Sequence, residues 1–251
     1  MRERSVTKDT GEPRQDALMD FVRAIAAGDG PTALGLLAAK PDLASARVAD
    51  GATRQSAKAY YFDDIGHYLY AGDTALHVAA AGYRQEIAQR LIAMGADVGA
   101  CNRRGAQPLH YAADGRPGAR SFNPRTQAAT IACLIASGAD PNASDNSGVA
   151  PLHRAVRTRC AAAVQALLDG GADVDRKNRS GSTPMRLATR NTGRGGSGLP
   201  EAKAQQAEIV RVLEQHGAGA VNLRAKWGTR EAADVGSACA ASLTGLHARC
   251  A

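Results

Sequence analysis

Apolar residues along the chain recur in four units of two helices and a turn between residues 72 and 218. The second helix of each unit carries apolar residues at i, i+3 and i+4 spacings, which predict one buried stripe. These residues are Ile87, Leu91 and Ile92; Ile131, Leu134 and Ile135; Val164, Leu167 and Leu168; and Ile209, Val210 and Leu213. A glycine follows each stripe and predicts the end of that helix: Gly95, Gly138, Gly171 and Gly217.

The first helix of each unit is short and sets the repeat period. Its start positions are Thr74, Gln107, Ala150 and Thr183, spaced by 33, 43 and 33 residues, so the middle spacing contains an insertion of ten residues. Thr74 and Thr183 are expected to cap their helices by accepting a backbone N–H bond. Prolines in the first turn fit this assignment, because the N–H that they lack has no helical partner there. The Asp-rich segment GADPNASDNSG predicts a turn that leads to the next unit.

These residues resemble the ankyrin repeat family, whose pattern is TPLHxAA followed by LLxxGADxN over a 33-residue period. The resemblance covers about residues 72–218. It implies an all-α solenoid of stacked helix–turn–helix units with finger-like turns, and protein binding through the fingers and the concave face of the inner helices. In this family the motif histidine bonds between adjacent turns, so His77, His110 and His153 are expected to be structural. No metal or cofactor is expected.

Outside the four units the pattern is weaker. Residues 1–15 are expected to be a disordered N-terminus, and residues 219–251 the remnant of a C-terminal cap with a tail. Residues 16–71 are interpreted as a degenerate cap repeat followed by a distorted repeat, which would begin near Asp50–Thr53. The distorted repeat holds five of the ten aromatic residues: Tyr60, Tyr61, Phe62, Tyr68 and Tyr70. They either plug the junction with the first full repeat or form an aromatic binding loop.

Two insertions are predicted between the helices of the second and fourth units, at residues 116–126 and 192–204. In the family's geometry both lie on the edge opposite the fingers. They either form a basic rim that engages an acidic partner or are tolerated surface loops, since loop closure costs little. The candidate rim residues are Arg116, Arg120, Arg125, Arg194 and Lys203.

Positive charge suggests what kind of partner the chain binds. The net charge is +7, and residues 101–200 hold 14 Arg plus Lys against 6 Asp, a local net charge of +8. Such an excess favours an acidic partner. The candidate contact residues on the inner helices are Tyr111, Arg154, Arg157 and Arg190. Those on the fingers are Arg103, Arg104, Arg176, Lys177 and Arg179.

The sequence therefore predicts a non-catalytic, monomeric module that binds a partner protein through its concave face and fingers. One alternative is an anionic ligand or nucleic acid on the Arg-rich face of the last repeats, although the arginines match no nucleic-acid reader motif. Another is a regulatory inhibitor of a partner enzyme. No Gly-x-Ser-x-Gly elbow is present, so no enzyme is expected.

Location is inferred from cysteines and hydropathy. Five separated cysteines without a CxxC pair argue for free thiols in a reducing cytosol and against structural zinc. The charged N-terminus lacks the apolar stretch of a signal peptide, and no run of 18 apolar residues occurs. A cytoplasmic protein without a membrane span is expected, and the Ala-rich, Arg-rich composition favours a bacterial gene.

Overall fold

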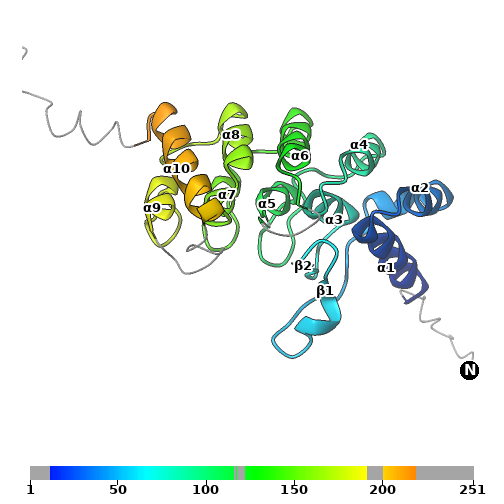
Figure 1. Ribbon diagram of the computed structural model, residues 1–251. Coiled ribbons are helices and arrows are strands. Elements are labelled where there is room, and N and C mark those ends of the chain that lie inside the picture. Colours follow the sequence, from blue (N-terminus) through cyan, green and yellow to red (C-terminus); the bar gives the residue numbers. More distant parts are fainter. Residues whose placement is uncertain (1–11, 116, 118–121, 191–199, 219–251) are drawn as a thin grey trace, which may run out of the picture.

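The chain forms an elongated stack of helix pairs in two layers (Figure 1). The computed structural model describes residues 12–115, 117, 122–190 and 200–218. The inner layer consists of α1 (Glu12–Ala27), α3 (Ala75–Ala81), α5 (Pro108–Ala113), α7 (Pro151–Arg157) and α9 (Pro184–Thr189). The outer layer consists of α2 (Gly30–Ala39), α4 (Gln85–Ala93), α6 (Pro124–Ala136), α8 (Ala161–Asp169) and α10 (Pro200–Gln215).

Short elements between α2 and α3 complete the described chain. They are the 3₁₀ turns η1 (Pro41–Ala44) and η2 (Ala57–Tyr60), and the antiparallel pair β1 (Tyr61–Phe62) and β2 (His67–Tyr68). The prediction of an all-α solenoid is confirmed, and this small hairpin is an addition that the prediction did not contain. Among the described helices, none combines the length and apolar character needed to span a membrane.

One apolar seam runs between the two layers through every helix pair. Leu91, Leu134 and Leu167 of the outer helices are fully buried in it. Alanines on the inner helices, such as Ala79 and Ala112, are also fully buried and allow neighbouring helices to pack closely. A single pair of short helices has too little apolar surface to fold alone, so stacking supplies the core.

A buried histidine in each of three inner helices ties that helix to the next finger. Its Nδ1 accepts a backbone N–H bond of 3.1 Å at the start of its own helix, from Thr74, Gln107 and Ala150 respectively. Its Nε2 therefore carries the proton and donates to a carbonyl of the next finger, 3.0–3.1 Å away, at Ala106, Val149 and Ser182 respectively. Both ring nitrogens of His77, His110 and His153 are therefore occupied by hydrogen bonds within the chain.

The two predicted threonine caps stand at the starts of α3 and α9. The Thr183 hydroxyl accepts the N–H of Arg186 at 3.2 Å. The Thr74 hydroxyl lies 3.0 Å from Nδ1 of His77. Both residues have the extended backbone of an N-cap position.

Three finger turns share one pair of backbone hydrogen bonds. In the finger before α5, Asn102 N donates to Ala106 O and Gly105 N donates to Asn102 O. The fingers before α7 and α9 repeat this pair at Asp145 and Asn178. The turn requires a left-handed residue, and Gly105 supplies it at φ +72°. Two residues form the tip of each of these turns, for example 103 and 104.

Several predicted boundaries change. Helix α1 begins at Glu12, so residues 12–15 belong to the first helix pair and were wrongly assigned to a disordered tail. Asp50–Thr53 begin no repeat unit, because the chain leaves the stack there and returns at Gly72. Both predicted insertions end in helix, since α6 begins at Pro124 and α10 at Pro200.

In the sequence, some of the candidate rim residues precede the first residues of α6 and α10 and others follow them. Arg125 and Lys203 are exposed in the first turns of α6 and α10. Arg116, Arg120 and Arg194 lie outside the described residues, as do residues 1–11 and 219–251. The basic rim therefore stays a prediction.

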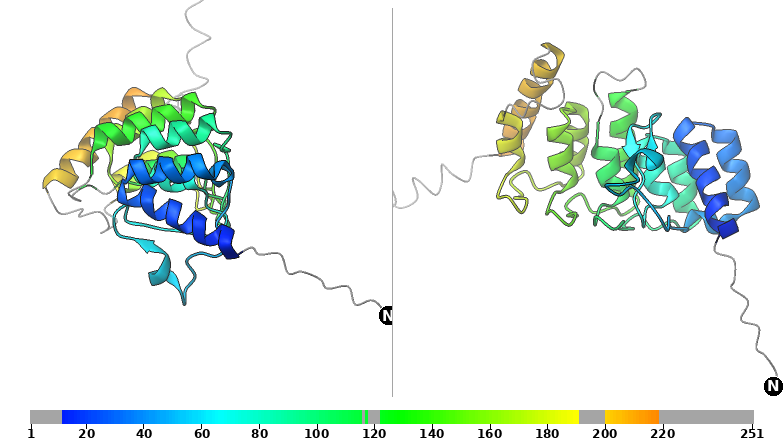
Figure 2. Two further views of the ribbon diagram at one scale, coloured as in Figure 1. Left: turned by 90° about the vertical axis from the view of Figure 1, so that its right-hand side faces the viewer. Right: turned by 90° about the horizontal axis from the view of Figure 1, so that it is seen from below.

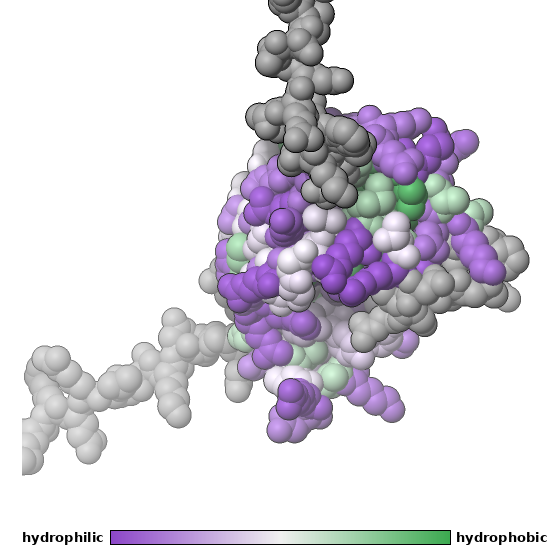
Figure 3. Space-filling view, turned by 90° about the vertical axis from the view of Figure 1, so that its left-hand side faces the viewer, coloured by the Kyte–Doolittle hydropathy of each residue, from purple (hydrophilic) through white to green (hydrophobic). Residues whose placement is uncertain are grey.

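The C-terminal end of the stack is mostly hydrophilic. Figure 3 looks onto this end, where α9 and α10 face the viewer and hydrophilic side chains surround a smaller apolar group. Repeat stacks need such polar terminal surfaces, because a bare apolar end would associate with other molecules.

Acidification is expected to destabilise the fold through the buried histidines. Burial and, to a smaller extent, Arg154 lower the pKa of His110 from 6.5 to about 4, and burial lowers the pKa values of His77 and His153. Below pH 6.5, these histidines therefore bind protons in the unfolded chain that they do not bind in the folded chain. The stability from neutral His110 is complete above pH 6.5 and is lost as the pH falls towards 4, by up to about 1.4 kcal/mol per pH unit.

Urea unfolding over this pH range measures the effect. The His110→Gln variant is expected to lose less stability per pH unit than the unaltered chain, because it has one titrating group fewer. Equal slopes for the two proteins would contradict this explanation.

Candidate binding site

The Tyr-rich segment is an insertion at the tip of the first finger. Gly72 N donates to Val48 O at 2.8 Å, and Val48 N donates to Asp73 O at 2.8 Å. This is the hydrogen-bond pair that closes the other fingers, with residues 49–71 in place of the usual two-residue tip. Gly51 makes the closure possible, because a side chain there would collide with the backbone of Tyr70 and Ala71.

The inserted segment folds back over the inner-helix face of α3 and α5. In the view from below in Figure 2, the hairpin β1–β2 lies in front of these helices. Ile65 and Leu69 are buried against the stack, and Ile65 packs beside Gly82. The ring of His67 stacks on Tyr111 with a centroid distance of 4.0 Å. Most aromatic side chains of the inserted segment pack against the stack, which is the first of the two alternatives given for them. Tyr68 differs, because it is 39% exposed.

Two predicted finger contacts instead hold the hairpin. Arg103 donates to the carbonyl of Ala52, and its guanidinium lies 5.5 Å from the centroid of the Tyr70 ring. Arg104 donates to the Tyr70 hydroxyl at 2.8 Å and lies 4.9 Å from the same centroid. Both arginines remain exposed at the surface, so they can also meet a ligand.

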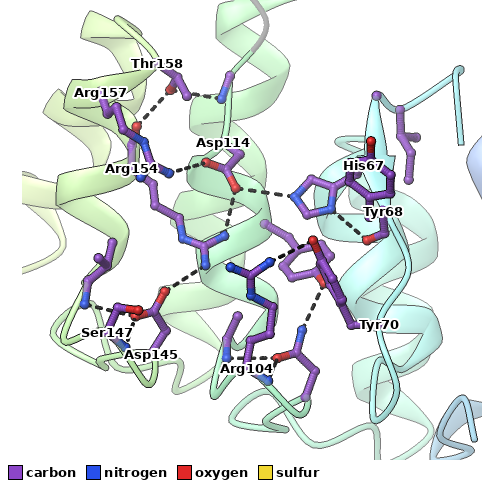
Figure 4. Close-up of a pocket in the computed structure, with 17 residues that line it drawn as sticks. His67, Tyr68, Tyr70, Arg104, Asp114, Asp145, Ser147, Arg154, Arg157 and Thr158 are labelled. Atoms are coloured by element: carbon purple, nitrogen blue, oxygen red, sulfur yellow. Dashed lines mark hydrogen bonds and ion pairs between the residues drawn. The ribbon is translucent and has the colours of Figure 1, made fainter. Parts of the chain in front are cut away.

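Arg154 forms a two-sided ion pair in the centre of the site (Figure 4). One guanidinium nitrogen lies 2.8 Å from Oδ2 of Asp114, the residue that follows α5, and the other lies 3.0 Å from Oδ2 of Asp145 on the finger. The Arg154 side chain is only 11% exposed. The prediction that Arg154 is a free partner contact is therefore wrong, because two carboxylates of its own chain already occupy its charge.

Both aspartates are held in the ionised form. Burial by itself would raise the pKa of Asp114, but Arg154 and the His67 ring outweigh it and keep that pKa well below its usual range. Burial by itself would also raise the pKa of Asp145. The N–H groups of Ser147 and Val149, together with Arg154, outweigh this effect and lower the pKa. The pair around Arg154 is thus charged over the whole physiological pH range.

Tyr111 is also internal, contrary to the prediction of a contact surface. Its side chain is covered by His67, and the residue is 2% exposed. Its hydroxyl donates to Asp73 at 2.8 Å and accepts from Asn102 Nδ2 at 3.0 Å. Burial, followed by Asp73, raises the pKa of Tyr111 well above its ordinary value, so the phenol stays protonated.

Between the hairpin and α7 lies a pocket of about 480 Å³. The hairpin forms one wall with His67, Tyr68 and Tyr70. Its other walls come from α5, α7 and their fingers, and carry Arg104, Asp114, Asp145, Ser147, Arg154, Arg157 and Thr158. Without the insertion at the first finger, this space would be open groove.

The remaining candidate contacts lie at the pocket or beyond it, towards the C-terminal end. Arg157 of α7 lines the pocket with a side chain that is 43% exposed, and Arg190 is exposed at the end of α9. On the last finger, Lys177 and Arg179 are exposed, and Arg176 donates to the Ser144 hydroxyl at 3.0 Å. Arg157 and Arg190 together line a second, smaller pocket, which the residues of the last finger do not line.

Nothing in the described part of the site has an activated nucleophile. Burial raises the pKa of the neighbouring Cys160 thiol to about 12, so it remains protonated at neutral pH. Within the described residues, no three His, Cys, Asp or Glu side chains are placed to share a metal ion. The arrangement is suited to holding a ligand by charge and hydrogen bonds.

Sequence reasoning missed His67, Asp114 and Asp145 as members of the site. The signal at Asp114 was its place on an inner helix, four residues after His110 as Arg157 is four residues after His153. At Asp145 the signal was only that of a turn. His67 gave no signal, because its contact with Asp114 joins residues 47 positions apart.

Removing Arg154 is expected to cost far more stability than removing Arg157. Arg154→Ala leaves Asp114 and Asp145 buried without their cation, which should lower the free energy of unfolding by about 3 kcal/mol or more. Arg157→Ala removes a half-exposed side chain 4.0 Å from Asp114, and should cost under about 1 kcal/mol. Urea unfolding of both variants at neutral pH gives the comparison, and similar losses would refute the central role of Arg154.

Comparison with known families agrees with this architecture. The model described as "Ankyrin repeats (3 copies)" matches residues 25–122, and the one described as "Ankyrin repeats (many copies)" matches residues 134–188. Together the two matches span more than half of the chain. No curated protein matched the sequence. Repeat period, helix pairs, finger turns and both family matches agree, and the chain belongs to the ankyrin repeat family.

Proposed function

We propose that this chain binds a partner protein along the open half of its inner-helix face, which consists of α7, α9 and the fingers that precede them. Ankyrin repeats generally serve as protein–protein interaction modules. The proposal names the face and the charge of the partner. It involves no catalytic step by this chain.

The observation that carries the proposal is the division of the inner-helix face by the hairpin. The hairpin covers α3 and α5, with Ile65 and Leu69 buried beneath it. A partner that lies along the inner helices therefore meets α7 and α9 directly, and the outer wall of the hairpin at Tyr68. Exposed aromatic side chains of this kind are common at the centres of protein interfaces.

The open half carries exposed basic side chains from separate elements. Arg157 lies on α7, Arg186 and Arg190 on α9, and Lys177 and Arg179 on the last finger. A row of cations on one face favours a partner with acidic side chains and speeds its association. Arg154 is outside this set, because Asp114 and Asp145 neutralise it.

Nucleic acid remains the second candidate for the same row of cations, since phosphates also seek exposed arginines. The two candidates differ in how binding responds to salt. Phosphate binding weakens steeply as salt rises, whereas a protein interface with an aromatic centre keeps much of its affinity.

Reversing two exposed charges on the open half is expected to abolish partner capture. The immobilised chain is compared in native lysate with Arg157→Glu/Arg190→Glu and with a control of equal net charge, Arg90→Glu/Arg211→Glu, on the outer helices α4 and α10. Each reversal at the binding face should cost about 1–4 kcal/mol of affinity if it lies at an energetic centre. Mass spectrometry then identifies proteins retained by the unaltered chain and the control but lost from the double variant.

Nuclease treatment before capture separates the two candidates. Retention of the same proteins after nuclease supports the protein interface. Loss of all of them after nuclease, or equal retention by both double variants, would overturn the proposal.

A further inference from the structure

The pocket between the hairpin and α7 adjoins the proposed partner surface through one side chain. Arg157 lines the pocket and is also an exposed cation of the open half. A partner segment that lies along α7 therefore passes the mouth of the pocket. The chemistry inside the pocket indicates which side chain of that segment enters it.

Two of the three guanidinium groups in the pocket retain binding capacity for an anion. Arg104 donates to the Tyr70 hydroxyl and makes no ion pair within the described part of the chain. Arg157 has its nearest described carboxylate oxygen at 4.0 Å, on Asp114. Arg154, in contrast, makes contacts of 2.8 and 3.0 Å with both aspartates. The two carboxylates thus bind the central arginine and leave the outer two for a ligand.

The charge of the pocket matches a ligand with a single negative charge. Its lining holds three guanidinium groups, of Arg104, Arg154 and Arg157, and two carboxylates, of Asp114 and Asp145. The net charge of these five groups is +1. One carboxylate neutralises that charge, whereas a phosphate dianion would give these groups and the ligand together a net negative charge.

The size and the remaining walls fit an amino-acid side chain. The volume of about 480 Å³ falls within the usual range for ligand pockets and exceeds what one carboxylate requires. The rings of Tyr68 and Tyr70 offer apolar contact for methylene groups, and the hydroxyls of Ser147 and Thr158 lie among the lining groups. Arginine forks bind carboxylates in a bidentate manner.

We propose that this pocket receives the carboxylate of one aspartate or glutamate side chain from the partner segment on the α7–α9 face. Arg157 and Arg104 bind the carboxylate, and Arg154 is a positioning residue that fixes α5, α7 and the finger around it. The hairpin supplies the wall that turns an open groove into a selective pocket. This inference rests on the proposed function for the source of the side chain, but the pocket chemistry is tested without the partner.

Three blocked tripeptides serve as probes for the full-length, ¹⁵N-labelled chain at about pH 8, where a phosphoserine side chain is a dianion. They are Ac-Gly-Glu-Gly-NH2, the uncharged Ac-Gly-Gln-Gly-NH2 and the dianionic Ac-Gly-pSer-Gly-NH2. The glutamate peptide is expected to give saturable NMR shifts at the amides of Ser147 and Thr158 and at the side-chain N–H of Arg157. The glutamine peptide should bind at least tenfold more weakly.

Matched variants assign the binding groups. Arg157→Gln should weaken glutamate-peptide binding about tenfold or more, whereas Arg90→Gln, on the outer helix α4, should leave it unchanged. Arg104→Gln should weaken binding, and Tyr70→Phe, which keeps the cation but removes its bond to the hairpin, should weaken it less. Unchanged spectra away from the pocket show that each variant is folded.

Three results would overturn the proposal. The first is equal binding of the glutamate and glutamine peptides, and the second is binding of the phosphoserine peptide more than tenfold tighter than the glutamate peptide. The third is shifts confined to exposed arginines outside the pocket. Failure of capture by the open face with intact, Arg157-dependent peptide binding would remove the partner proposal alone, because the tripeptides report on the pocket without any partner.

Discussion

The hydrogen bond from a buried, neutral imidazole to the next finger underlies both the fold and the site. It fixes the start of each of three inner helices and the position of the following finger at the same time. The fingers in turn carry Arg104, Asp145 and Ser147 to the pocket. If these rings were charged, the backbone N–H that each Nδ1 accepts would face a second donor, and the bond that holds the start of each helix to the ring would be lost. The geometry of the binding face therefore depends on imidazoles that no ligand touches.

Most of the stack could be predicted from the sequence because its signals are local. Apolar spacing, first-turn prolines and the glycines that follow the outer helices all act within one unit, and the pairs from α3 to α10 follow from them. The first pair was also visible in outline, although its helix begins at Glu12, earlier than composition suggested. Local signals fail where the chain stops following the period, which is why Asp50–Thr53 was mistaken for the start of a unit.

The binding face was harder to predict, because the residues that cover a given side chain there come from distant parts of the sequence. Repeat geometry correctly put Tyr111 and Arg154 at one register of successive inner helices. It gave no indication that His67 would cover Tyr111, or that Asp114 of the preceding unit would reach Arg154 diagonally. A formal charge count therefore overstated the free positive charge of this face, since it treats an arginine inside an ion pair like one in water.

The insertion at the first finger has an evolutionary consequence. Because Val48 makes the two hydrogen bonds of an ordinary finger turn with Gly72 and Asp73, the first finger closes as the other fingers do despite its long insertion. The entropy of closing a longer loop grows only slowly with its length. An insertion at this finger tip can therefore be lengthened, replaced or lost without compensating changes in the rest of the stack. Selection can thus alter which ligands the groove binds by changing this one segment.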